Sequence, residues 1–131
     1  DESAIRFSKP ATPVTVIGDR GELQTVFSNL LDNAVKYSTG EPKISVRVKS
    51  SRTNKAEIYI RDHGIGVKRT DLKRIFKRFY RVPNKSINAA KGTGLGLAIV
   101  RSILDKHGGR VRAQSKGEGK GTTFFVQLPM K

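Results

Sequence analysis

Hydrophobic residues recur along this chain with two different periods, one typical of helices and one typical of strands. The clearest helical period follows Asp19, where apolar side chains fall at the three- and four-residue spacing of a single helix face. Asp19 and Glu22, three residues apart, resemble a capping box at the start of this helix. We expect the polar segment 38–42 to end it. The apolar face consists of Leu23, Val26, Phe27, Leu30, Leu31, Ala34 and Val35.

Strict alternation of apolar and polar residues then predicts half-buried strands. It covers residues 44–48 and residues 56–60, and the polar segment 50–55 between them is expected to form a hairpin loop. A weaker alternation over residues 14–17 predicts a short strand before the first helix. Two further strands are expected near the end of the chain, at residues 111–114 and 122–128, joined by a glycine-rich turn.

The middle of the chain predicts a short helix, a long loop and a second long helix. The short helix is expected over residues 70–77, and the second long helix ends at His107, before two glycines. Residues 82–92 are polar and aperiodic, and a loop of this length in a compact domain is often a functional lid. This order of elements predicts one compact domain, residues 1–131, with a mixed sheet and helices on one face.

The charge and composition of the chain limit the classes of partner and site that we expect. The chain has 131 residues and a net charge of +15, from 26 Lys and Arg against 11 Asp and Glu. The basic residues are densest over residues 68–81. Such a charge favours nucleotides, nucleic acid or an acidic protein, although we expect most basic side chains to be solvated. The absence of cysteine excludes disulfides and cysteine metal sites. No apolar run approaches the roughly 20 residues of a membrane span, and no signal segment starts the chain, so we expect a soluble piece.

Glycines gather in three clusters, which indicates tight turns or backbone that approaches a ligand. The clusters lie at residues 64–66, 92–96 and 119–121. No P-loop motif is present, and Leu97 stands where a dinucleotide fingerprint requires glycine. The middle cluster opens a predicted helix, and the exposed N–H groups of a helix N-terminus bind phosphate well.

Polar residues interrupt the first helix in a regular way. Asn29, Asn33 and Lys36 share one face, and Asn33 neighbours Tyr37. These residues are explained either by a solvated stripe or by a row that meets a ligand. In the second case the Asn oxygens would bind Mg²⁺ beside phosphate groups. The pattern alone leaves both explanations open.

Five motifs, in order, resemble the boxes of the ATP-binding catalytic domain of bacterial sensor histidine kinases, which has the GHKL or Bergerat fold. Residues 29–38 resemble the asparagine box, 62–66 the first glycine box, 76–82 the phenylalanine box, 92–100 the second glycine box and 119–124 the last. The resemblance implies an α+β fold. This is a two-layer α/β sandwich with a mixed, mostly antiparallel sheet of about five strands, about three helices on one face and a mobile ATP lid.

The resemblance also assigns roles at the phosphate end of the site. Asn33 would be the main Mg²⁺ ligand with Asn29 beside it, Lys36 would contact phosphate, and Arg81 would reach the γ-phosphate. Asn29, Lys36 and Arg81 are therefore the predicted catalytic residues. The second glycine box would cradle the phosphates and hinge the lid, with Leu95 and Leu97 also serving as packing residues. Its predicted nucleotide-binding residues are Lys91, Gly92, Thr93, Gly94, Leu95, Gly96 and Leu97.

At the adenine end, Asp62 would accept a hydrogen bond from the amino group, and this donor–acceptor pairing would reject guanine. Tyr37 would lie against the base, and Gly64 and Gly66 would let the chain pass close to it. On the other side of the adenine, closure is expected from Thr122 and Thr123.

The implied reaction is transfer of the ATP γ-phosphoryl group to a histidine on a separate dimerisation domain, in two-component signalling with a response regulator. Neither His63 nor His107 has the sequence context of that acceptor, so the phosphoacceptor domain is expected to be absent. The resemblance also implies a cytoplasmic domain of a homodimeric, membrane-attached kinase. The high charge suggests, as a hypothesis, contact with an acidic regulator or hairpin.

Two other function classes compete with this one. The first is a relative on the same fold, either an anti-sigma serine kinase or an ATPase of the topoisomerase, mismatch-repair or chaperone type. Those ATPases generally place a water-activating glutamate where Asn29 stands, which favours a kinase. The second is a nucleic-acid-binding module, which charge alone suggests. Aromatics are 7% of the chain and are not interleaved with a basic stripe, so no nucleic-acid partner is expected.

Overall fold

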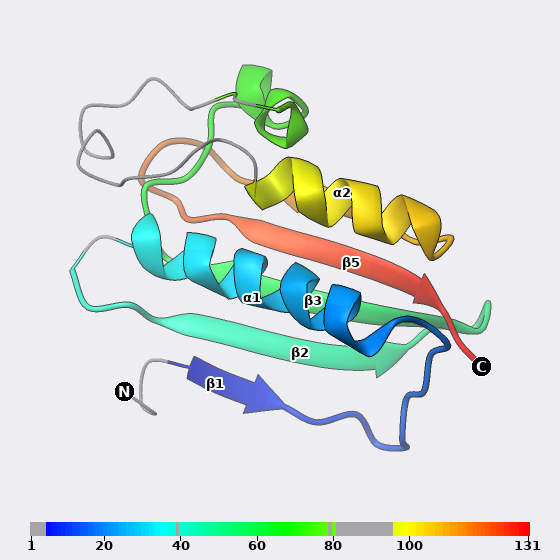
Figure 1. Cartoon of the computed structure of the whole chain (residues 1–131). Coiled ribbons are helices and arrows are strands. Elements are labelled where there is room, and N and C mark those ends of the chain that lie inside the picture. Colours follow the sequence, from blue (N-terminus) through cyan, green and yellow to red (C-terminus); the bar gives the residue numbers. More distant parts are fainter. Residues whose placement is uncertain (1–4, 39, 79, 81–95) are drawn as a thin grey trace.

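The computed structural model describes residues 5–38, 40–78, 80 and 96–131. Within them, a five-stranded sheet is covered on one face by helices, and the two long helices lie side by side across it (Figure 1). The elements are β1 (Ile5–Ser8), α1 (Arg20–Lys36), β2 (Ile44–Ser50), β3 (Lys55–Asp62), the 3₁₀ turns η2 (Arg69–Asp71) and η3 (Arg74–Phe76), α2 (Gly96–Lys106), β4 (Arg110–Gln114) and β5 (Thr123–Pro129).

The sheet is mixed and mostly antiparallel, in the order β1-β2-β3-β5-β4. Only β1 and β2 are parallel; the other three neighbouring pairs are antiparallel. The predicted fold class is therefore confirmed. The predicted lid over residues 82–92 lies outside the described residues.

The core lies between the sheet and the two long helices. Val26 and Leu30 of α1 and Val100 and Leu104 of α2 are fully buried, and Val126 of β5 is fully buried beneath them. Burial of one such side chain contributes roughly 1.5–3 kcal/mol relative to exposure, so this layer provides much of the fold's stability. The period-three-and-four pattern read from the sequence marks the face that packs on the sheet. Val35 is an exception, since it is 49% exposed.

The N-terminal strand was predicted in the wrong place. Residues 14–17 form no strand; Val16 makes an isolated bridge with Met130, and Ile17 is 75% exposed. Val14 and Val16 alternate because one side of this connecting segment packs against the core. The actual first strand, β1, is only four residues long and is exposed along its whole length. Its apolar–polar alternation, with Ile5 and Phe7 on one side, was not singled out in the sequence.

The predicted short helix over residues 70–77 takes the form of the two 3₁₀ turns. Ile75 and Phe76 are buried there, and the Phe76 ring meets Phe124 edge-on at a centroid distance of 6.2 Å. The buried carboxylate of Asp71 accepts a hydrogen bond from the Tyr80 hydroxyl. Phe76 is thus a core residue of the phenylalanine box, while Phe79 lies outside the described residues.

The start of α1 is tied to the end of α2. The Asp19 carboxylate accepts a hydrogen bond from Glu22 N at 2.8 Å, which confirms the predicted N-cap. The reciprocal half of a capping box is replaced by tertiary contacts. Asp19 N donates to His107 Nε2 at 3.0 Å, and the Glu22 carboxylate pairs with Lys106 Nζ at 2.7 Å. Gly18 makes room for this arrangement, since a Cβ there would lie 2.5 Å from the imidazole.

These contacts assign His107 a structural role at the helix ends. Its Nδ1 lies 2.8 Å from the Ile103 carbonyl oxygen, so Nδ1–H donates there while Nε2 accepts from Asp19 N. Replacing His107 by Ala removes both hydrogen bonds. We expect the free energy of unfolding to fall by about 1 kcal/mol in chemical denaturation at neutral pH. Arg101→Ala, an exposed change on the same helix, is the control and should leave stability unchanged. Equal stability of the two variants would contradict the assignment.

Candidate functional site

Four elements bring predicted site residues together at one end of the sheet. These are the C-terminal ends of α1 and β3, the start of β5 and the N-terminal end of α2 (Figure 1). Hydrogen bonds link them: Asn29 Nδ2 of α1 donates to the Gly96 carbonyl at 3.3 Å, and Ile65 N donates to the Tyr37 carbonyl at 3.0 Å. Motifs that are far apart in the sequence therefore form one locality.

Asp62, at the end of β3, is buried, and one of its carboxylate oxygens is hydrogen-bonded within the fold. The residue is only 5% exposed, and its Oδ1 accepts hydrogen bonds from Gly64 N at 2.9 Å and Thr122 N at 3.1 Å. No donor within the described part of the chain reaches Oδ2. The second oxygen is therefore available to accept from a ligand.

The electrostatics of Asp62 reflect two opposing effects. Burial raises the pKa of its carboxyl above the ordinary value, while hydrogen bonds from Gly64 and Thr122 and the charge of His63 lower it by less. Because both backbone donors point at Oδ1, they hold the ionised carboxylate in place but offset only part of the free-energy cost of burying its charge. Such a group, at a strand end and shifted by its surroundings, is typical of a binding site.

Glycine is required around Asp62 because backbone segments cross there at close range. A Cβ on Gly64 would lie 2.0 Å from the Tyr37 carbonyl oxygen, and one on Gly121, at φ +74°, would lie 2.3 Å from the Asp62 carbonyl oxygen. Gly66 is buried in the same turn. The first and last glycine clusters thus let two turns enclose one carboxylate.

Ser115 supports these turns and was not singled out in the sequence. Its hydroxyl accepts from Val67 N at 3.1 Å and from Gly117 N at 3.2 Å, and lies 2.7 Å from the Gly121 carbonyl, to which it donates. A serine just after a strand is too common to predict such a role. Only the fold, which brings β4 beside the glycine turns, shows it.

The polar face of α1 points toward the start of α2 at Asn29. Asn29 and Asn33 are half-buried, Lys36 is exposed in the last turn, and Tyr37 is the half-buried C-cap residue. The contact between Asn29 and Gly96 shows that this face is not simply a solvated stripe. The amide nitrogen of Asn29 is the donor in this contact, and no described residue is hydrogen-bonded to its amide oxygen.

The two threonines of the last glycine box lie in different environments. Thr122 is buried and bonded through its N–H to Asp62. Thr123 pairs with Arg61 and Gln114 and alternates with the buried Phe124, so it lies on the sheet face away from the helices. Leu97 packs against the core. The predicted residues Arg81, Lys91, Gly92, Thr93, Gly94 and Leu95 lie outside the described part of the chain.

The donor set suits a metal ion that arrives with phosphate. No group of three His, Cys, Asp or Glu side chains that could hold an ion occurs among the described residues. The candidate ligands are the amide oxygens of Asn29 and Asn33, which are neutral. Mg²⁺ prefers oxygen ligands and usually keeps waters and phosphate oxygens, so these two residues fit such an ion only beside a nucleotide.

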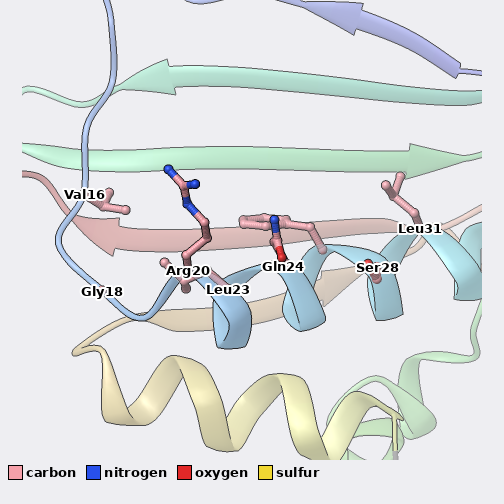
Figure 2. Close-up of a pocket in the computed structure, with 8 residues that line it drawn as sticks. Val16, Gly18, Arg20, Leu23, Gln24, Ser28 and Leu31 are labelled. Atoms are coloured by element: carbon pink, nitrogen blue, oxygen red, sulfur yellow. The ribbon is translucent and has the colours of Figure 1, made fainter.

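An open pocket lies elsewhere, beside the N-terminal half of α1 (Figure 2). Figure 2 shows side chains of α1 directed into it, with Val16 at one end and Leu31 at the other. None of the predicted nucleotide-binding residues lines it. Its lining is Val16, Gly18, Arg20, Leu23, Gln24, Phe27, Ser28 and Leu31.

The raised pKa of Asp62 predicts how stability depends on pH. The folded state binds the proton more tightly than the unfolded state, so the wild type loses stability as pH rises from 3.8 through the raised value. Asp62→Asn keeps an oxygen acceptor for both N–H groups but does not titrate. Urea denaturation across this range should show the wild type losing stability relative to the variant. Parallel pH profiles would contradict the burial effect.

Comparison with known proteins gives the family. Residues 18–131 match the family model described as histidine kinase-, DNA gyrase B- and HSP90-like ATPase. The sensor protein kinase WalK of Staphylococcus haemolyticus is 43% identical over 112 residues, which cover 85% of this chain and 18% of WalK.

No helix among the described residues is long and apolar enough to cross a membrane.

Solved structures agree with this result. The mycobacterial sensor histidine kinase MprB superposes with a TM-score of 0.83 at 36% identity, covering 98% of this chain and 84% of that one. Full-length ShkA in complex with AMPPNP superposes with a TM-score of 0.78 at 27% identity, covering 98% and 26%. The chain therefore belongs to the histidine kinase-, DNA gyrase B- and HSP90-like ATPase family, as a catalytic ATP-binding domain of the sensor histidine kinase type.

Proposed function

We propose that this chain binds Mg²⁺-ATP between the ends of α1, β3 and α2, and donates the γ-phosphoryl group to a histidine on a separate dimerisation domain. The observation that carries the proposal is the Asp62 carboxylate, whose Oδ1 is held by two backbone N–H groups while Oδ2 lacks a donor among the described residues. A fixed acceptor at a buried strand end suits the exocyclic amino group of adenine. It would repel the carbonyl oxygen of guanine.

The phosphate end would lie toward the start of α2. The N-terminus of this 11-residue helix offers N–H groups and a favourable dipole for anions. Asn29 already contacts its first residue, Gly96, and Lys36 is an exposed cation on the neighbouring helix end. When bound, Mg²⁺ would neutralise phosphate charge. Asn33 and Asn29 would hold it through their amide oxygens, and Lys36 and Arg81 would offset the remaining charge.

Phosphoryl transfer depends mainly on positioning and charge stabilisation, which suits a site without a nucleophile of its own. The two histidines of the chain are poor candidates for the acceptor. Both ring nitrogens of His107 are engaged, and His63 Nδ1 lies 3.3 Å from the Lys43 carbonyl oxygen. The acceptor is therefore assigned to another domain, so that residues 1–131 act as one ATP-binding unit.

The relatives support the wider setting. ShkA binds the ATP analogue AMPPNP in its solved complex, and WalK is named a sensor protein kinase. By similarity, the proposed partners are a histidine-bearing dimerisation domain and a response regulator receiver domain, within a homodimeric, membrane-attached kinase whose catalytic part faces the cytoplasm. No nucleic-acid partner is proposed.

Phosphotransfer in trans tests this function. The chain is mixed with [γ-³²P]ATP, Mg²⁺ and a separately produced histidine-bearing dimerisation domain of a sensor kinase such as WalK. We expect an acid-labile phosphohistidine on that domain. Asn33→Ala should reduce the initial rate by roughly 10- to 100-fold, because loss of a metal ligand or its support typically has that effect.

Asp32→Ala is the matched control, because Asp32 is the exposed neighbour of Asn33 on the same helix turn. It should transfer phosphate at the wild-type rate. Binding of ATP without any transfer to an acceptor domain would limit the function to nucleotide binding. Equal loss in both variants would show damage to α1 in place of a role for Asn33.

A further inference from the structure

The sheet face turned away from the helices is strongly basic. The strands alternate, so every second side chain points to this outer face, which no described helix covers (Figure 1). Among the described strands, Glu57 is the one acidic residue on it. The basic residues of this outer face are Arg6, Arg47, Lys49, Lys55, Arg61, Arg110 and Arg112.

The long helices show no such excess. In α1, Arg20 and Lys36 are balanced by Glu22 and Asp32. In α2, Arg101 and Lys106 stand against Asp105. The net charge of +15 is therefore not distributed as a uniform solvated coat. Seven of the basic residues lie on the outer face of the sheet, and residues 68–78 carry a further six against Asp71. The charge of the outer face therefore calls for an explanation separate from that segment.

Strand register organises the outer face around two aromatic rings. Arg47 pairs with Tyr59, Tyr59 with Phe125, and Phe125 with Arg112, which gives a row across four strands. The Tyr59 and Phe125 rings are in contact, with centroids 5.0 Å apart. Basic residues thus flank an aromatic pair in space, although the two kinds of residue are not interleaved along the sequence.

Cations already cover these rings. The Arg112 guanidinium lies 5.0 Å from the centre of Phe125, and Lys49 Nζ lies 5.4 Å from the centre of Tyr59. Single-stranded nucleic acid binds such platforms by stacking bases on free aromatic faces, and the cations occupy these faces. The same contacts hold Arg112 in place over the sheet, where its planar fork can pair with a carboxylate.

We propose that the outer face of the sheet is a docking surface for an acidic segment of a protein partner. Arginine and aromatic residues are enriched in protein interfaces whereas lysine is depleted, and five of the seven cations here are arginines around a Tyr–Phe pair. A sheet twists by roughly 20–25° per strand, so cations on β1 and β4 do not lie in one plane. An elongated acidic segment can follow this surface better than a planar membrane can.

This docking surface does not depend on the proposed nucleotide site, because Asp62 and α2 belong to the opposite side of the sheet. Binding is tested with the full 131-residue chain and a fluorescent oligoglutamate peptide of about 20 residues, which its like charges keep extended at neutral pH. We expect binding that weakens as salt is raised. The double variant Arg47→Glu/Arg112→Glu should weaken it about tenfold or more.

The matched control is Arg20→Glu/Arg101→Glu, which changes the net charge equally but on the exposed helices. It should bind within roughly twofold of the wild type, since screened charges on the far side contribute little. Arg47→Gln/Arg61→Gln, which leaves both cation–ring contacts in place, should weaken binding several-fold and covers the case in which Arg112→Glu impairs folding.

Three outcomes would overturn the proposal. Equal weakening by the outer-face and helix-face variants would mean that net charge alone attracts the peptide. Tighter binding of a single-stranded oligonucleotide than of the peptide, lost in the outer-face variants, would assign the surface to nucleic acid. The same result with phosphatidylserine-containing vesicles would assign it to a membrane.

Discussion

The buried carboxylate of Asp62 is the constraint on which the geometry of the site depends. To ionise away from water it needs donors, and the Gly64 and Thr122 N–H groups supply two of them. Both donors sit in turns that can approach only where a Cβ is absent, as at Gly64 and Gly121. The remaining cost of burial appears in the raised pKa of the Asp62 carboxyl, while Oδ2 receives no hydrogen bond from the described residues.

The same end of the sheet connects stability to function through the long helices. α1 supplies core residues on one face and the candidate metal and phosphate contacts near its C-terminal end, while its N-terminal end is fixed by His107. A shift of α1 against α2 would therefore move Asn29 relative to Gly96, which it contacts. Packing at one end of the helices thus sets distances at the other.

The features of the fold that depend on local patterns could be predicted from the sequence. The apolar face of α1, the strands β2 and β3, and the meeting of the motifs around Asp62 follow from periodicity and from motif resemblance. The predictions were wrong where contacts between residues far apart in the sequence determine the structure. Asp19 N is bonded by His107, 88 residues away, in place of the predicted local partner, and Val16 alternates without entering the sheet. The roles of Ser115 and of the basic outer face likewise arise only from register between strands.

Recognition of adenine by Asp62 is the central proposal, and the most direct measurement compares the binding of ATP and of inosine triphosphate by calorimetric titration. Inosine triphosphate carries a carbonyl oxygen where ATP carries the amino group. We expect the wild type to prefer ATP by roughly 100-fold, since a buried acceptor strongly rejects a ligand that lacks the donor. In Asp62→Asn, whose amide nitrogen can face that carbonyl, the preference should shrink to a few-fold. Equal affinity of the wild type for both nucleotides, or an unchanged preference in Asp62→Asn, would contradict the account.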